Sequence, residues 1–191
     1  MAKTPVKTAV VIGILVLAGA AAALAQEAPV EFTGNIINMQ GGGTARIRLH
    51  VDSYTPDEEI QQYVGALQAN GMDGVMKMMW KAKECGWVKI GSQLGYPVEI
   101  VRIRPTEKGH LIVAVTDRPI QFFELRNGVR SMDYPLGMVI LEIDKDGKGE
   151  GKVIAAAKAN FTKDGKVELE SYGTEPLRVI RVATEPVKPK K

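Results

Sequence analysis

The chain contains a single cysteine among its 191 residues, so no disulfide can form within it. Side-chain packing must therefore hold the fold together. Cys85 has three lysines nearby in sequence, at positions 81, 83 and 89, which would favour a reactive thiolate. The alternative, which we favour, is that Cys85 acts as a small buried apolar residue at the end of a helix.

Histidine is also scarce, because the chain has only His50 and His110. It lacks both a His-Glu-x-x-His motif and paired cysteines, which excludes a structural zinc site. A hydrolase would need a general base, and we expect both histidines to be solvated, one on the polar face of a strand and one beside a turn. We therefore lean towards a protein that is not an enzyme, and we predict no metal and no cofactor.

The chain also lacks a large excess of positive or of negative charge. The formal net charge is +3, and two of the lysines, Lys3 and Lys7, lie in the first 25 residues, where no acidic residue occurs. Without that segment the charge falls by two, to +1. Such a chain has no field that could hold nucleic acid, so we expect no nucleic-acid partner.

Residues 1–25 have the pattern of a secretory signal peptide. Lys3 and Lys7 precede an uncharged run over 9–24, which ends in Ala23-Leu24-Ala25. A membrane-spanning helix needs about 20 strongly apolar residues, and this run of mainly alanine and glycine is too short and too weakly apolar. We expect cleavage before Gln26, no membrane span afterwards, and export to the periplasm or the extracellular space.

Composition divides the remaining chain into three parts. We expect a flexible lead-in over residues 26–43, because Gly41-Gly42-Gly43 has high conformational entropy and no side chains to pack. A single α+β domain is predicted over residues 44–184. The tail, residues 185–191, is rich in proline and lysine and is predicted to be disordered.

The domain is predicted to begin with a strand and two helices. Apolar and polar residues alternate over 44–51, which indicates a half-buried strand. Thr55 and Glu58 have the spacing of a capping box that would start a helix. Asn70-Gly71 predicts the end of this helix, and Asp73 is expected to cap a second one that reaches about residue 84. The result would be a helical hairpin.

The rest of the domain is predicted to be a curved antiparallel β-meander, either barrel-like or a half-barrel, so that the sheet has about eight strands in all. Adjacent apolar residues at Ile100-Val101 and Val179-Ile180 predict bulges that bend the sheet. The expected strands are 87–90, 98–104, 111–116, 138–143, 153–161, 167–172 and 177–182.

The methionines of the second predicted helix have two interpretations. Met72, Met76 and Met79 fall at helical spacing near Trp80. In an exported protein their thioethers can bind Cu(I). Methionine also fills gaps where a helix packs on a curved sheet, and we favour this packing role.

A ligand site is predicted where side chains are small. Ala155, Ala157 and Ala159 share one face of an expected strand and leave volume that a ligand can occupy. Arg102 and Arg104 could neutralise an acidic headgroup if they share the inward phase of Val98 and Ile100. The alternative is that the helical hairpin fills the space beside the alanines and that the arginines are solvated.

A long loop over residues 120–133 has no clear periodicity and carries Phe122 and Phe123. Loops of this length often serve as lids or binding segments. We include both phenylalanines among the candidate binding residues.

Three segments of the chain carry a resemblance. They are Gly91-Ser-Gln-Leu-Gly-Tyr-Pro97, Arg130-Ser-Met-Asp-Tyr-Pro-Leu-Gly-Met-Val-Ile-Leu-Glu-Ile-Asp-Lys-Asp-Gly-Lys-Gly-Glu-Gly and Glu168-Leu-Glu-Ser-Tyr-Gly-Thr-Glu-Pro-Leu-Arg178. With these segments the chain resembles a group of exported bacterial hypothetical proteins. The resemblance covers most of the chain after residue 25. It implies export and a shared fold, but it carries no assigned activity and no site residues.

Two functions remain open from the sequence. The first is an exported non-enzymatic protein that binds an apolar or acidic small molecule, or a lipid, between its sheet and its helices. The alternative is a domain that binds an envelope or extracellular protein through the 120–133 loop and the sheet edges, without a small-molecule pocket.

Overall fold

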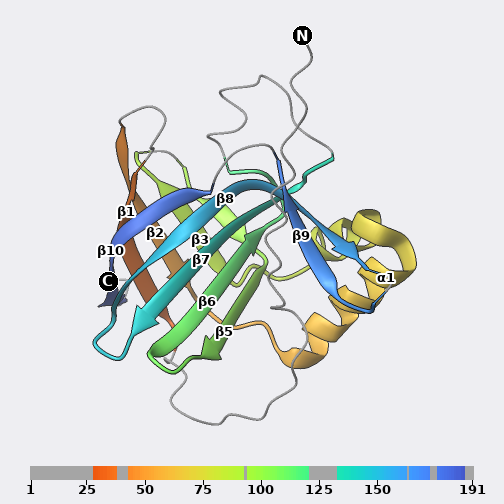
Figure 1. Ribbon diagram of the computed structural model, residues 1–191, viewed down its shortest axis with the longest axis horizontal. Coiled ribbons are helices and arrows are strands. Elements are labelled where there is room, and N and C mark those ends of the chain that lie inside the picture. Colours follow the sequence, from red (N-terminus) through yellow and green to blue (C-terminus); the bar gives the residue numbers. More distant parts are fainter. Residues whose placement is uncertain are drawn as a thin grey trace.

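The computed structural model describes residues 28–37, 43–92, 94–120, 133–162, 164–172 and 176–187. The expected signal peptide, the phenylalanines Phe122 and Phe123, and residues 188–191 of the expected tail lie outside these residues. Within them the chain forms ten strands and one helix (Figure 1). They are β1 (Val30–Ile37), β2 (Thr44–Val51), α1 (Asp57–Met79), β3 (Gly86–Ile90), β4 (Tyr96–Val98), β5 (Ile100–Pro105), β6 (Gly109–Thr116), β7 (Leu136–Asp144), β8 (Lys148–Phe161), β9 (Val167–Ser171) and β10 (Leu177–Pro186).

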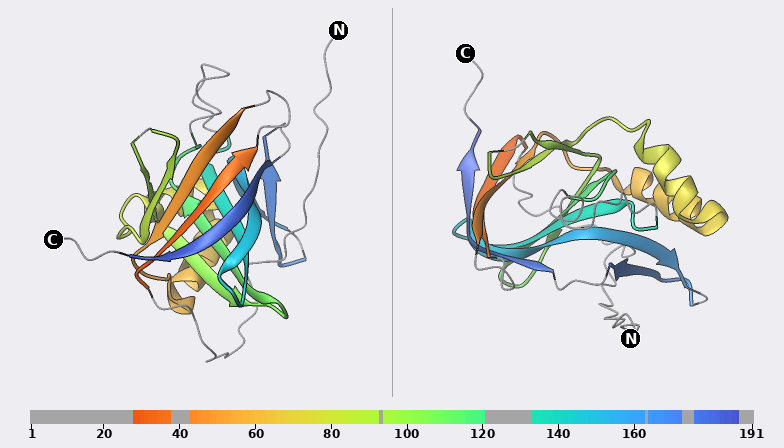
Figure 2. Two further views of the ribbon diagram at one scale, coloured as in Figure 1. Left: turned by 90° about the vertical axis from the view of Figure 1, so that its left-hand side faces the viewer. Right: turned by 90° about the horizontal axis from the view of Figure 1, so that it is seen from above.

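All ten strands belong to one strongly curved antiparallel sheet. The order of hydrogen-bonded neighbours is β4-β3-β2-β1-β10-β8-β7-β6-β5, and β9 pairs with the far half of β8. Figure 2 shows the sheet wrapping around so that it is nearly closed, with α1 at one end of the molecule. The predicted antiparallel, barrel-like architecture is therefore confirmed, although the number of strands is larger than expected.

Glu99 joins the two ends of this sheet. β4 and β5 stand at opposite ends of the pairing order, yet Glu99 is the single residue between them in sequence. The Glu99 N–H donates to the carbonyl of Val115 in β6 at 3.1 Å, and the Cys85 N–H donates to the carbonyl of Val98 at 2.7 Å. The predicted single strand over 98–104 is thus two strands, because the chain passes from one sheet end to the other at this residue.

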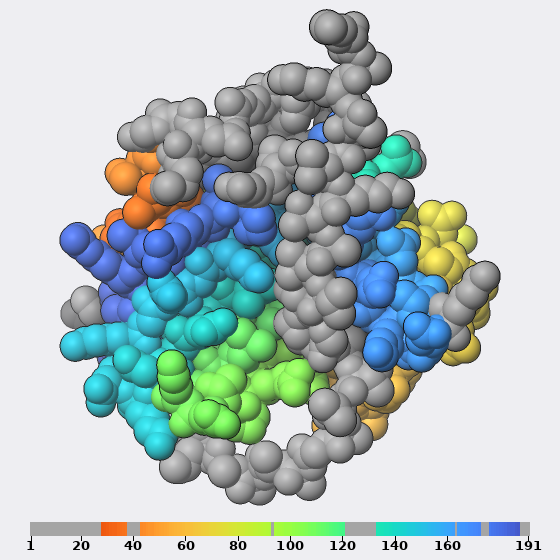
Figure 3. Space-filling view, viewed as in Figure 1, coloured from red at the N-terminus to blue at the C-terminus, as the bar shows by residue number. Residues whose placement is uncertain are grey.

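Alternating side chains along the strands supply two separate cores. Side chains on the concave face, such as Val101, Ile112 and Val139, fill the interior of the curved sheet. Their sequence neighbours, such as Val113 and Met138, point to the opposite face and pack beneath α1. The space-filling view shows β5 to β8 side by side, with β9 and α1 at one edge (Figure 3).

Strand β1 corrects the expectation of a flexible lead-in over residues 26–43. Val30, Phe32 and Ile36 are each at most 4% exposed, and β1 pairs with both β2 and β10. Gly34 takes the inward position between Phe32 and Ile36, where a Cβ atom would lie 2.9 Å from Cγ1 of Val179. Because Gly34 has no side chain, the apolar-polar alternation of β1 is hard to recognise in the sequence. In the fold, the same absence of a side chain leaves room for Val179 of the neighbouring strand β10.

The start of α1 differs from the predicted capping box. The N-cap residue is Pro56, and no side chain caps the helix. The Thr55 hydroxyl instead accepts the N–H of Val101 at 2.9 Å, while the Thr55 N–H donates to the carbonyl of Val101 at 2.8 Å. Thr55 is therefore bound to strand β5, which fixes the first turn of α1 against the sheet.

The predicted helix end at Gly71 is seen as a break inside α1 rather than as a separate hairpin loop. Gly71 has φ 60° and ψ −153°, which is not helical, and helical residues lie on both sides of it. The second segment ends at Met79, a few residues before the expected position. Glycine has no Cβ atom, so Gly71 adopts this backbone conformation at little cost in free energy.

Strand β10 also runs further than expected. It continues to Pro186, so the first residues of the predicted tail, Glu185 and Pro186, pair with Glu31 and Val30. The predicted bulge near Val179-Ile180 is confirmed, because the register against β8 shifts between Val179 and Val182. Arg181 lies in this bulge and has φ 53°.

The structural role of β1 gives a stability prediction. Phe32→Ala should lower the free energy of unfolding by roughly 3–5 kcal/mol, because it opens a cavity between fully packed strands. Thr44→Ala, at an exposed position of the neighbouring strand, should change it by less than about 0.5 kcal/mol. Urea denaturation of both variants measures these values. A Phe32→Ala protein as stable as Thr44→Ala would contradict the assignment of β1 to the core.

Candidate functional site

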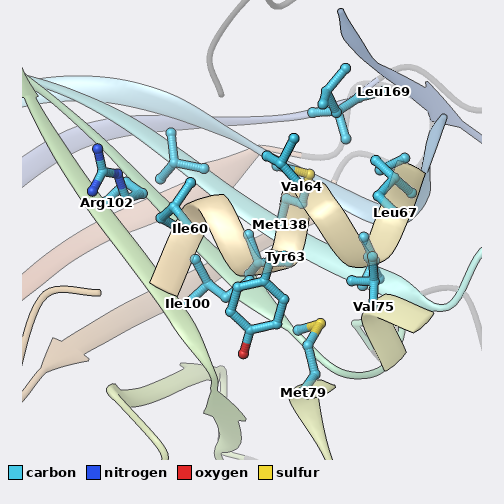
Figure 4. Close-up of a pocket in the computed structure, with 15 residues that line it drawn as sticks. Ile60, Tyr63, Val64, Leu67, Val75, Met79, Ile100, Arg102, Met138 and Leu169 are labelled. Atoms are coloured by element: carbon cyan, nitrogen blue, oxygen red, sulfur yellow. The ribbon is translucent and has the colours of Figure 1, made fainter. Parts of the chain in front are cut away.

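A pocket lies between α1 and the face of the sheet opposite the interior core (Figure 4). Its volume is about 80 Å³. Apart from one arginine and the hydroxyl of one tyrosine, its lining side chains are apolar. They are Ile60, Tyr63, Val64, Leu67, Val75 and Met79 from α1, and Ile100, Arg102, Val113, Val115, Leu136, Met138, Ala159, Val167 and Leu169 from β5 to β9.

Two periodicities in the sequence build this lining. Residues three or four apart, such as Ile60, Val64 and Leu67, share one face of α1 and point towards the sheet. Residues two apart on a strand, such as Val113 and Val115, share one face of the sheet and point back at the helix. The pocket is the space that these two apolar faces leave between them.

The predicted face of three alanines is only partly present. Ala159 lines the pocket, and Ala157 is buried in the same cluster. Ala155 does not line it, and its carbonyl accepts the N–H of Ile120 at 2.8 Å. The reason is a register shift, because Leu136 pairs with Ala157 whereas Met138 pairs with Ile154, so β8 contains one extra residue here.

The helix packs directly against these alanines, as the alternative interpretation of the sequence proposed. The Ala159 N–H lies 3.3 Å from the sulfur of Met72. Met76 and Met79 are 7% and 1% exposed and belong to the core beneath α1. The methionines thus have the predicted packing role, and the space that remains beside Ala159 is the pocket.

The two candidate arginines follow a different phase from the one expected. Val98 belongs to the interior core, whereas Ile100 and Arg102 line the pocket on the other face, because Glu99 interrupts the alternation. The sequence-based hypothesis required Arg102 and Arg104 to point to the same face of the sheet as Val98, and this requirement is wrong for Arg102. Arg104 lies two residues beyond Arg102 on β5 and is half-buried, but it does not line the pocket.

Arg102 stands at one end of the pocket beside Ile60, as Figure 4 shows. Its guanidinium lies 2.5 Å from a carboxylate oxygen of Asp57 and donates to the carbonyl of Thr55 at 3.2 Å. The Asp57 side chain is 67% exposed, while that of Arg102 is 26% exposed. The cation is thus held at the pocket by a partner that solvent or another anion can replace.

Tyr63 contributes its ring to the pocket and has a buried hydroxyl. The carboxylate of Glu59, on the same helix, lies near this hydroxyl. Burial, followed by the negative charge of Glu59, raises the pKa of Tyr63 to about 12. The hydroxyl therefore remains protonated at neutral pH, and the ring of Tyr63 is its main contribution to the pocket lining.

Glu99 is a buried carboxyl group next to the pocket that the sequence analysis did not identify as a candidate. It is 4% exposed, and one carboxylate oxygen accepts the N–H of Asp117 at 2.9 Å. Burial, followed by the negative charge of Asp117, raises the pKa of Glu99 to about 7. The feature of the sequence that indicates a buried carboxyl group is the position of this glutamate between the apolar residues Val98 and Ile100.

Cys85 lies beside Glu99 and is buried, in agreement with the interpretation that we favoured. It is 8% exposed, and its thiol donates to the carbonyl of Glu99 at 3.3 Å. Its sulfur also lies 3.6 Å from the Thr55 hydroxyl. Cys85 therefore helps to pack the junction between the two ends of the sheet.

The described part of the chain contains no candidate metal site and no candidate membrane-spanning helix. No group of three or more His, Cys, Asp or Glu side chains there could hold a metal ion. No helix among those residues is long and apolar enough to cross a membrane.

Comparisons with known proteins do not assign the site. No protein-family model, no curated protein and no solved structure matches the chain. The predicted resemblance to exported bacterial proteins therefore stays a prediction, and the pocket is interpreted from its own geometry.

The buried carboxyl of Glu99 predicts a pH dependence of stability. Since its ordinary pKa is 4.5 and its pKa in the fold is about 7, the folded state binds more protons than the unfolded state between these pH values. The stabilisation that Glu99 contributes to the folded state is fully present below pH 4.5 and is lost as the pH rises to about 7. The loss is on the order of 3 kcal/mol.

Glu99→Gln isolates this effect, because glutamine keeps an oxygen that can accept the Asp117 N–H but does not titrate. The difference in unfolding free energy between the original protein and the variant, measured by urea denaturation across this pH range, should shift in favour of the variant as the pH rises. A difference that is independent of pH would show that Glu99 ionises as an ordinary surface carboxylate does.

Proposed function

We propose that this is an exported, non-enzymatic protein that binds a small apolar molecule, or the end of an acyl chain, in the pocket between α1 and the sheet. The observation that supports this most is the pocket itself, because its lining is apolar apart from Arg102 and the Tyr63 hydroxyl. Ligand sites are typically of this kind, with an apolar lining and a few polar groups that fix orientation. Its place of action would be the periplasm or the extracellular space.

The size of the pocket limits the ligand. A designed cavity of roughly 150 Å³ holds one benzene molecule, and this pocket of about 80 Å³ is close to half that size. It accommodates a few carbon atoms as it stands. A longer chain would enter if α1 moved away from the sheet, and the break at Gly71 is where its two segments can change their relative angle.

Arg102 favours a ligand with an acidic headgroup. Its guanidinium lies at one end of the pocket and is paired with the exposed carboxylate of Asp57. An incoming carboxylate can replace Asp57 and form the same charge-assisted hydrogen bonds, while the apolar part of the ligand occupies the pocket. A fatty acid combines both properties.

The first test fills the pocket. Ala159→Leu places a larger side chain in the lining and should weaken the binding of dodecanoate at least tenfold, as measured by isothermal titration calorimetry. Ala69→Leu makes the same change at an exposed position of α1 and should leave the affinity unchanged. Equal affinities for the two variants, or no binding by the original protein, would contradict the proposal and favour an interaction domain without a pocket.

The second test concerns the headgroup. Arg102→Gln should weaken the binding of dodecanoate by about 10- to 100-fold, because a charge-assisted hydrogen bond contributes roughly 1.5–3 kcal/mol. The affinity for dodecanol, which has the same chain and no charge, should change little. Equal losses for both ligands would assign Arg102 a structural role and remove the acidic headgroup from the proposal.

A further inference from the structure

We propose that the end of α1 and the turn after it bind an anionic lipid surface. The surface consists of Lys77, Trp80, Lys81 and Lys83, and we call it the Trp80 patch. All four residues are exposed. This inference goes beyond the pocket and does not require the pocket to be occupied.

The segment that carries the patch has two different faces. Val75, Met76 and Met79 are buried against the sheet, whereas Trp80 is 65% exposed. Lys77, Trp80 and Lys81 are spaced three and four residues apart, so they share the outer face. The helical path continues through them, because the N–H groups of Trp80 and Lys81 donate to the carbonyls of Met76 and Met78 at 3.0 Å.

The positive charge of the patch exceeds the negative charge beside it. In the portion of the chain that the structure describes, no acidic group lies within ion-pair distance of Lys77, Lys81 or Lys83. Residues 77–84 contain three lysines and one acidic residue, the exposed Glu84, so this segment has a formal charge of +2. Three unpaired cations around one indole ring are complementary to an anionic surface.

The form of the patch favours a lipid surface over a protein. A stable protein interface needs about 800 Å² on each partner, with an apolar core made of several side chains. Here the exposed apolar group is one indole surrounded by lysines. Tryptophan is enriched at the headgroup level of membranes, and lysine can place its stem along apolar groups while its charge stays in water.

The position of the patch suits contact with a flat surface. α1 lies at one side of the molecule, beyond the nearly closed part of the sheet, and its second segment turns back towards the sheet after the break at Gly71 (Figures 1 and 2). Trp80 directly follows Met79, which lines the pocket. Binding through the patch would therefore bring the pocket close to the lipids.

Vesicle binding tests the proposal with the purified protein. In a Trp87→Phe background, Trp80 is the one remaining tryptophan. Its emission should shift to shorter wavelength with vesicles made of equal parts phosphatidylcholine and phosphatidylglycerol, and not with phosphatidylcholine alone. High salt should reverse the shift, because it screens the attraction between exposed charges.

Charge variants locate the binding surface. Lys81→Gln should lower the partition coefficient about fivefold, since one lysine near an anionic surface contributes about 1 kcal/mol. Replacement of Lys77, Lys81 and Lys83 together by glutamine should lower it on the order of 100-fold. The matched control replaces Lys108, Lys145 and Lys166, three exposed lysines outside α1, and should retain binding.

Three outcomes would overturn the inference: equal losses for the two triple variants, an unchanged Trp80 emission, or binding to neutral vesicles alone. The first would indicate attraction by net charge, and the second would leave an acidic protein as the partner of the lysines. Ala159→Leu separates this inference from the proposed function, because it should weaken dodecanoate binding at least tenfold while vesicle binding continues.

Discussion

The fold depends on how the two ends of one curved sheet are joined. Glu99 is the single residue between β4 and β5, which stand at opposite ends of the strand order. Around it, Cys85 and Thr55 hold the adjoining backbone in place through hydrogen bonds to Val98 and Val101. Because Thr55 also precedes the first turn of α1, the same contacts that close the sheet determine where the helix begins.

Closure of the sheet decides where space remains for a pocket. The interior of the curved sheet is filled by large side chains such as Phe32, Leu49 and Ile112, each of which is at most 1% exposed. The sheet is therefore a packed core and not a container. The opposite face of β5 to β7 cannot be covered by the sheet itself, so α1 covers it, and space remains where helix and strand side chains meet. A pocket outside the barrel-like sheet is the consequence.

Local periodicity predicted those parts of this arrangement that depend on neighbouring residues. The alternation along 44–51 correctly predicts β2, because burial of one face of a strand imposes a period of two. Local patterns do not predict the role of a residue where a distant strand determines it. Thr55 is bound to Val101 rather than to its own helix, and the phase of the alanines changes at a bulge in β8.

Glu99 and the Trp80 patch show opposite uses of charge in one small region. The carboxyl of Glu99 is buried, so the fold raises its pKa and keeps it largely neutral below pH 7. The lysines of the patch are exposed and unpaired, and their charge costs little in water. Tyr63 and Met79 of α1 line the pocket. α1 thus separates an apolar site from a cationic surface by the width of a single helix, so contact with an anionic surface on one side and entry of an apolar chain on the other would act on the same element.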